Sequence, residues 1–191
     1  NSTTTLVIDA DSSLGASGNV SMGGGGSAGN VATLRLQPGT SSATLASSRT
    51  LSFTADRNFE MRIGSGGSLT IAGVLNPQGT NTAARNIIKT DAGTLVFTNK
   101  NLFTGASSFS PGLAVRGGTV QLDSSTGNFT ASTDRFFPDS TNPLPLAFSA
   151  ASGTFAGGGT LEIVQGSGNA FALTQGFGNA TFNTGGNTIK L

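Results

Sequence analysis

Hydrophobic and polar residues alternate with a period of two along much of this chain. The alternation is clearest in residues 50–71, where Glu60 and Arg62 are interleaved with apolar residues. A period of two marks a β-strand with one apolar face and one solvated face. The residues that we expect on the apolar faces of these strands are Leu51, Phe53, Phe59, Met61, Ile63, Leu69 and Ile71.

Other short segments have the same character and are separated by stretches rich in Gly, Pro, Ser and Asn. No segment of ten or more residues shows helical periodicity, which argues against a βαβ fold. About fifteen short strands, spaced roughly 8 to 17 residues apart, leave a β-solenoid or a β-sandwich as the two architectures. The further strands that we predict cover residues 5–10, 32–37, 93–97, 117–122, 143–148, 160–164, 170–174, 180–183 and 188–191.

The repeated glycines favour the solenoid. Residues 157–163 (GGGTLEI) repeat the pattern of residues 117–122 (GGTVQL). In a solenoid each coil buries its apolar face on the next, and glycine supplies the positive φ that tight corners need. We therefore predict an all-β chain forming a right-handed parallel β-helix, with residues 1–191 as a single β-solenoid domain. A β-sandwich is the alternative.

The repeat is best developed in residues 86–123. Two Gly-Thr pairs are each followed by an alternating strand, and an Asn- and Thr-rich corner lies between them. This stretch resembles the passenger-associated strand repeat of bacterial autotransporters, whose usual form is close to K-T-G-x-G-T-L-x-L-x-G-x-N-x-Y-T-G-x-T-x-V-x-x-G-T-L-x-L. The residues that fall on the pattern are Lys89, Thr90, Gly93, Thr94, Leu95, Phe97, Asn101, Phe103, Thr104, Gly105, Val115, Gly118, Thr119, Val120 and Leu122.

The stretch departs from the pattern at three places. Asp91 stands where the pattern has glycine, Phe103 stands where it has tyrosine, and Phe109 to Gly112 look like a small insertion in the second corner. Upstream, residues 68–73 (SLTIAG) look like the lead-in that such repeats often have. The resemblance implies a β-helix exported to a bacterial cell surface, as a segment or subunit of a larger assembly. It implies almost nothing about biochemical activity.

Composition narrows the classes of function. Only 10% of residues are charged and the formal net charge is +1, which provides no electrostatic basis for binding nucleic acid or an anionic membrane. The chain has no cysteine, which excludes disulfides and thiolate metal sites. No apolar run approaches the roughly 18 residues that span a bilayer, and the first ten residues lack a targeting segment. We expect no nucleic-acid partner and no membrane span in this chain.

Few residues could carry chemistry. The absence of histidine excludes a Ser-His-Asp triad and an ordinary zinc site that uses histidine. Residues 9–13 (DADSS) resemble the start of a calcium loop, with Asp9 and Asp11 as ligands. However, the glycine comes one position late, at Gly15, and no glutamate occupies the twelfth position. We interpret this segment as a polar turn after a strand.

A second candidate is a polysaccharide-cleaving groove containing Asp56, Arg57, Glu60 and Arg62. Glycoside hydrolysis needs two carboxylates about 5 to 9 Å apart, and the sequence nominates no such pair. We interpret Glu60 and Arg62 as a solvated ion pair on one strand face.

The 13 phenylalanines could stack on sugars, but most occupy apolar strand positions, which predicts a buried stack. The glycine runs lack the lysine and the helix of a phosphate loop. Four N-glycosylation sequons are expected by chance in a chain so rich in Asn, Ser and Thr; they begin at Asn1, Asn19, Asn128 and Asn179.

These observations predict a non-catalytic extracellular structural module, such as a stalk, a fibre or filament subunit, or an adhesin-like passenger. We expect no catalytic, cofactor-binding or metal-binding residue. Because the chain ends in mid-strand at Leu191, we expect end-to-end self-association or continuation into further repeats. The alternatives are a carbohydrate-active β-helix enzyme, either lyase or hydrolase, and a pilin-like β-sandwich fibre subunit joined by exchange of the terminal strands.

Overall fold

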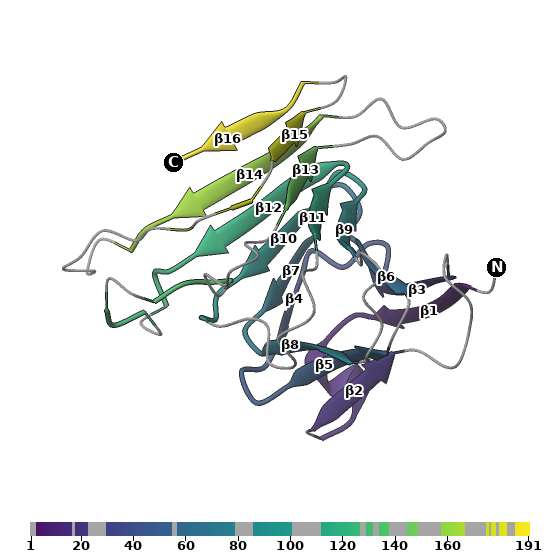
Figure 1. Ribbon diagram of the computed structural model, residues 1–191. Helices are drawn as coiled ribbons and strands as arrows, with labels where there is room; N and C mark the ends of the chain where they lie inside the picture. The colour runs from purple at the N-terminus through teal and green to yellow at the C-terminus, as the bar shows by residue number, and fades with distance from the viewer. Residues whose placement is uncertain are drawn as a thin grey trace.

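The fold is a stack of parallel strands that wind as a β-solenoid in the computed structural model (Figure 1). The structure describes residues 3–16, 18–22, 30–54, 57–78, 86–100, 112–126, 129–131, 134–137, 145–148, 158–166, 175, 177–178, 180–182 and 186–191. Its helical content there is a single 3-10 turn, η1 (Asp11–Leu14). Every strand pairing in these residues is parallel, so the predicted parallel solenoid is confirmed and the antiparallel sandwich alternatives are wrong.

The strands form three sheets. Sheet A contains, in order, β1 (Thr3–Ile8), β3 (Asn30–Leu36), β6 (Arg57–Arg62), β9 (Asn86–Thr90), β11 (Gly112–Val115), β13 (Leu146–Phe148) and β15 (Ala180–Phe182). Sheet C contains β4 (Ser42–Leu45), β7 (Ser68–Ile71), β10 (Thr94–Phe97), β12 (Gly118–Asp123), β14 (Gly159–Val164) and β16 (Thr188–Lys190). Sheet B contains β2 (Asn19–Met22), β5 (Thr50–Thr54) and β8 (Val74–Gln78).

The chain visits the sheets in turn, so that each coil lies on the one before it. Two coils are complete, with one strand in each sheet: β3–β4–β5 and β6–β7–β8. From β9 onward the described part of each coil contributes one strand to sheet A and one to sheet C. Figure 1 shows sheet C rising from β4 to β16, with sheet B below at the end nearer β1.

The core consists of rows of equivalent residues from successive coils. In sheet C, Leu69 pairs with Leu95, Leu95 with Val120 and Val120 with Leu161, and all four are buried. In sheet A, Ala32, Phe59, Ile87, Leu113 and Leu146 form a corresponding buried row. Each side chain is covered by the one above and the one below, so burial is shared along the axis rather than concentrated at a centre.

Aromatic residues occupy the third side of the solenoid beyond β8. Phe129 and Phe136 pack with ring centroids 4.4 Å apart, and Phe137 meets Phe97 edge-on at 6.3 Å. All four rings are buried. The phenylalanines that follow β12, at positions 129, 136 and 137, therefore extend the hydrophobic core.

The sequence predicted most of the longer strands correctly and missed several short ones. The strands that it missed are β2, β4, β8 (Val74–Gln78), β9 and β11, each of four or five residues. The insertion predicted at residues 109–112 overlaps a strand, because Gly112 begins β11; residues 109–111 lie outside the described residues. The strand predicted for residues 143–148 is shorter, because β13 begins at Leu146 and residues 143–144 lie outside the described residues. The strand predicted for residues 170–174 also lies outside them.

Glycines at the corner between sheets A and C allow the coils to approach each other. A Cβ on Gly93 would meet the carbonyl oxygen of Gly64 and Cγ2 of Ile63, and it would lie 2.7 Å from the carbonyl oxygen of Gly67. Gly118, in the next coil, is similarly enclosed by backbone and has φ +64°. These positions therefore require glycine for close packing, and Gly118 requires it also for its conformation.

The variant Gly93→Ala should lower the free energy of unfolding by about 2 kcal/mol or more, because backbone in the preceding coil must move to admit the methyl group. The matched control is Gly64→Ala, since a Cβ there meets nothing within 4 Å. Urea unfolding of both variants checks this expectation. Equal stability of the two variants would contradict the packing of the corner.

Candidate functional site

A fully buried lysine lies at the corner between sheets A and C. Lys89 occupies an inward position on β9, in register with Met61 on one side and Val115 on the other. Its Nζ donates hydrogen bonds to the carbonyl oxygens of Thr90 at 2.6 Å, Asp91 at 2.8 Å and Gly117 at 3.3 Å. The ammonium group thus has an acceptor for each proton and ties the corners of two successive coils together.

Burial lowers the pKa of Lys89 from 10.5 to about 8, and the nearby Asp91 carboxylate opposes part of that shift. A lowered pKa in a cleft is typical of a nucleophilic amine. Here the amine is enclosed by core side chains and bonded to backbone carbonyls, which leaves no room for a substrate. Lys89 is therefore a structural cross-link between coils. Its position two residues after Ile87, in the apolar register, is the sequence signal for this role.

Asp91, which stands where the autotransporter repeat has glycine, adopts a backbone conformation that is typical of glycine. Its φ is +63°, and it is the one non-glycine residue with positive φ among the residues described here. Aspartate is among the side chains that best tolerate this conformation. Its carboxylate accepts a 3.4 Å hydrogen bond from Nε of Arg62, and its carbonyl accepts one from Lys89. The corner therefore keeps the geometry of a glycine, and the aspartate side chain adds one polar contact, to Arg62.

The predicted ion pair between Glu60 and Arg62 is not what the structure shows. Glu60 accepts hydrogen bonds from the hydroxyl groups of Thr33 at 3.1 Å and Thr90 at 2.9 Å, from the coils before and after its own. Arg62 pairs with Asp91 instead. Parallel register places Thr33 directly beside Glu60, about 4.8 Å away, whereas Arg62 is about 6.6 Å away along the same strand. Thr90 lies diagonally from Glu60, beside Arg62, and reaches the carboxylate with its hydroxyl group. Asp56 and the side chain of Arg57 lie outside the described residues.

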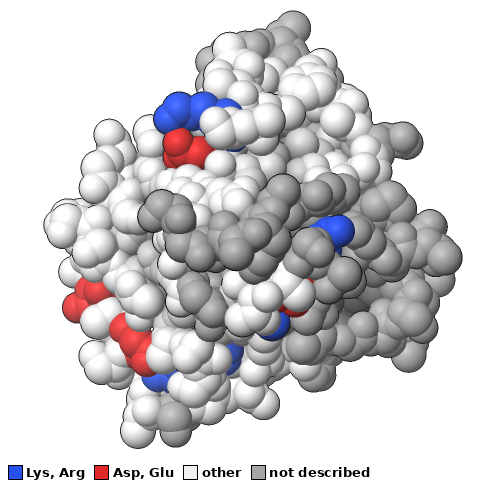
Figure 2. Space-filling model, turned by 90° about the vertical axis from the view of Figure 1, so that its left-hand side faces the viewer, with Lys and Arg blue, Asp and Glu red and all other residues white. Residues whose placement is uncertain are grey.

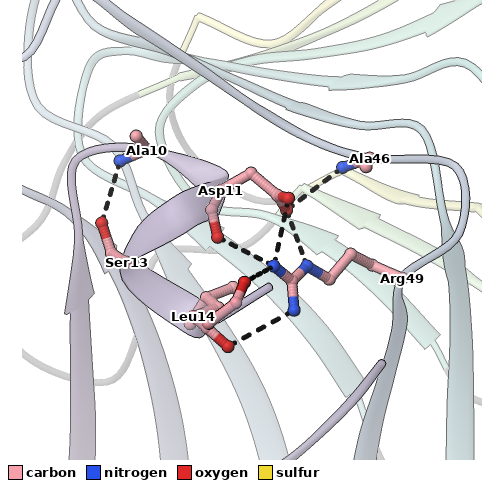
Figure 3. A network of polar contacts seen from close by, with 7 residues as sticks. Ala10, Asp11, Ser13, Leu14, Ala46 and Arg49 are labelled. Atoms are coloured by element: carbon pink, nitrogen blue, oxygen red, sulfur yellow. Dashed lines mark hydrogen bonds and ion pairs between the residues drawn. The ribbon is translucent and has the colours of Figure 1, made fainter. Parts of the chain in front are cut away.

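A second buried cation, Arg49, fastens the first coil to the second (Figure 3). Its guanidinium group contacts the Asp11 carboxylate at 2.8 and 3.1 Å and donates to the carbonyl oxygens of Asp11, Leu14 and Gly15. The Asp11 carboxylate also accepts a hydrogen bond from the amide of Ala46. The side-chain hydrogen bond from Arg49 holds the pKa of Asp11 below its ordinary value.

This arrangement decides the role of the calcium-like segment. The carboxylate of Asp11, the second proposed ligand, forms an ion pair with Arg49. The Asp9 carboxylate accepts a hydrogen bond from the hydroxyl group of Ser13. The segment forms η1 directly after β1, as the interpretation of a polar turn requires. In the part of the chain that the structure covers, no three Asp, Glu, His or Cys residues gather in a way that could hold a metal ion.

The remaining charges are dispersed over the surface. Lys100 pairs with Asp134 and Lys190 with Glu162, at 3.1 and 2.8 Å. Figure 2 shows the charged residues of one face as small groups, separated by uncharged described residues or by residues drawn in grey. No helix among the described residues has the length and apolarity to cross a membrane.

Most of the described phenylalanines are buried, as predicted, and one of the four sequon asparagines lies among the described residues. The predicted buried stack is confirmed for the seven phenylalanines in the core: Phe53, Phe59, Phe97, Phe129, Phe136, Phe137 and Phe148. Phe182 on β15 is instead exposed. Asn19 begins β2 at an exposed position, and the other three sequon asparagines lie outside the described residues.

The last coil leaves its inward rows uncovered. Ile189 on β16 continues the row of Leu161, yet Ile189 is 47% exposed and Leu161 is 1% exposed. Phe182 on β15 stacks on Phe148 with ring centroids 5.1 Å apart; Phe182 is 56% exposed and Phe148 is 1% exposed. This end of the stack, comprising β15 and β16, is called the open rung below. Among the described residues it is the main exposed apolar surface.

Comparisons of the chain with models of known protein families, with curated proteins and with solved structures found no match.

The buried amine predicts an unusual dependence of stability on pH. Because the pKa of Lys89 is about 8 in the folded chain and 10.5 ordinarily, the unfolded chain binds more protons between these values. The free energy of unfolding should therefore increase as the pH is raised from about 8 to about 10.5, by at most about 3 kcal/mol. Urea unfolding at several pH values checks it. The control Lys89→Met should lose this rise, and an equal rise in both proteins would contradict the assignment.

Replacing Arg49 should loosen the first coil. Arg49→Met leaves the carbonyl oxygens of Leu14 and Gly15 without their guanidinium donor and the Asp11 carboxylate without its cation, so the thermal midpoint should fall. Arg35→Met is the matched control, because Arg35 is only partly buried and has no ion-pair partner among the described residues. Thermal unfolding followed by circular dichroism compares them. A smaller fall for Arg49→Met than for Arg35→Met would show that the contact with η1 is dispensable.

Proposed function

We propose that this chain is a non-catalytic structural module of a bacterial surface protein, acting as a stalk, a fibre subunit or an adhesin-like passenger. The observation that carries the proposal is the unbroken in-register stacking of sheets A and C. Parallel stacking directs the backbone hydrogen bonds along the axis and extends the molecule by about 4.8 Å per coil. A fold of this kind lengthens without needing a larger core, as a stalk or fibre requires.

The distribution of polar groups supports a scaffold rather than an enzyme. The carboxylates of Asp11, Glu60, Asp134 and Glu162 are each engaged by neighbouring side chains at separate places. No two of them are held together as the acid and base of a glycosidase must be. The two buried cations, Lys89 and Arg49, bind backbone carbonyls. Release of reducing or unsaturated ends from a panel of polysaccharides would contradict the proposal.

Surface localisation rests on the resemblance of residues 86–123 to autotransporter passenger repeats, together with the lack of cysteine and the sparse charge. Antibody labelling of intact and lysed cells of the source bacterium tests it. We expect labelling of intact cells. Labelling that appears only after lysis would contradict a surface location.

We further propose that the open rung is covered by another β-coil, from a second copy of the chain or from continuing sequence. Ile189 and Phe182 hold inward positions whose equivalents in earlier coils are almost fully buried. A coil in register would remove both side chains from water and pair the free edges of β15 and β16.

Ile189→Lys should abolish self-association of the isolated chain, because it places a charge in the contact between coils. Thr70→Lys, which places the same side chain on the outward face of β7, should leave association unchanged. Light scattering over a range of protein concentrations measures both variants and the unmodified chain. An unmodified chain that stays monomeric at every concentration would count against end-to-end association.

A further inference from the structure

Three arginines share one outward row on sheet A. The register pairs Arg35 of β3 with Arg62 of β6, and Arg62 with Thr90 of β9. Arg116 follows β11 directly, and its amide donates to the carbonyl oxygen of Lys89 at 2.9 Å, which places Arg116 level with Thr90. The arginine row therefore consists, along the axis, of Arg35, Arg62, Thr90 and Arg116.

The spacing of the row follows from the fold. Neighbouring parallel strands lie about 4.8 Å apart, so the backbones of Arg35 and Arg62 are about 5 Å apart and those of Arg62 and Arg116 about 10 Å. The three arginines account for three of the ten Lys and Arg residues in the chain. Because they belong to three different coils, the row runs parallel to the solenoid axis.

Among the described residues, the arginines of this row have a single ion-pair partner, Asp91. Neither Arg35 nor Arg116 has an ion-pair partner among the residues that the structure describes, and Nε of Arg116 is buried without a hydrogen-bond acceptor. Arg62 has one contact, at 3.4 Å, with Asp91. Buried donors without acceptors are rare in folded proteins because each costs free energy. An anion bound from outside would balance the charges of Arg35 and Arg116, which have no ion-pair partner among the described residues.

The groups beside the row indicate what kind of acceptor fits. Glu60 lies in the same sheet face, with its carboxylate between the hydroxyl groups of Thr33 and Thr90. Guanidinium groups bind carboxylates in a planar, paired geometry, and the carboxylate and hydroxyl groups next to them can bind hydroxyl groups. A net charge of +1 with only three aligned arginines is too little to neutralise the many phosphates that a nucleic acid presents.

We propose that the arginine row binds a linear acidic polysaccharide lying along the solenoid axis. Carboxylates of the polymer contact Arg35 and Arg116, and its hydroxyl groups contact Glu60 and Thr90. The row binds the polymer without cleaving it. This goes beyond the scaffold role and rests on the register of sheet A and on the charges that its arginines leave unpaired, so a failure of end-to-end association leaves it standing.

Titration calorimetry with an oligomer of galacturonic acid at low ionic strength tests the proposal. The unmodified chain should bind the oligomer, and Arg35→Gln and Arg116→Gln should each weaken binding about fivefold or more. The matched control is Lys190→Gln, which removes one positive charge from an ion pair with Glu162 on sheet C. We expect its affinity to stay within about twofold of the unmodified chain.

Several results would overturn the proposal. These are no binding by the unmodified chain, equal weakening by Lys190→Gln, equal binding of a neutral maltose oligomer, or tighter binding of a DNA duplex than of the acidic oligomer. Arg116→Gln should fold normally, because it removes a buried donor that has no acceptor. Circular dichroism verifies this. If Arg116→Gln fails to fold, the comparison of Arg35→Gln with Arg35→Lys tests the proposal instead. Arg35→Lys keeps the charge but loses the paired hydrogen-bond geometry, so it should retain more affinity than Arg35→Gln.

Discussion

The structure depends on the in-register stacking of equivalent side chains from successive parallel strands. Leu95 is buried because Leu69 and Val120 lie on either side of it, and the same holds along every inward row. Such a core has no centre and gains stability with each added coil. It also explains why Ile189, chemically similar to Leu161 and in the same row, is half exposed: no coil covers it. The stability of the core and the exposure of its last coil therefore both follow from the burial of each coil by its neighbours.

Stacking of this kind requires the corners as well as the strands to repeat. Glycine at positions 93 and 118 lets the corner backbones approach, while Lys89 supplies donors to carbonyl oxygens that the corners leave free. Arg49 performs the same task near the start of the stack, where η1 replaces a strand of sheet C. The two fully buried cations thus serve the backbone. Buried charge, often a mark of catalysis, here belongs to the architecture.

The polar chemistry that remains lies on the outer faces, where the fold aligns it in rows. A parallel solenoid brings residues 24 to 41 positions apart in sequence side by side, as between Leu51 and Leu75 or Gln121 and Glu162. Rows along the axis suit extended partners better than small molecules, since successive groups repeat at the strand spacing. Both proposals, a coil added at the open rung and a polymer along the arginine row, use this geometry in different directions.

Local sequence determined the strands and the faces of their side chains wherever a period of two persisted, as in residues 57–62 and 118–123, because side-chain direction in a strand depends only on alternation. No strand was predicted at β9, where Ile87 and Ile88 are both apolar, so the inward position of Lys89 and its hydrogen bonds to the corner carbonyls of two coils are seen only in the tertiary structure. Partners were decided only by the tertiary structure. Glu60 bonds Thr33 and Thr90 rather than Arg62, and Asp11 bonds Arg49. The reason is that coils differ in length, so the register between strands follows from packing the whole stack.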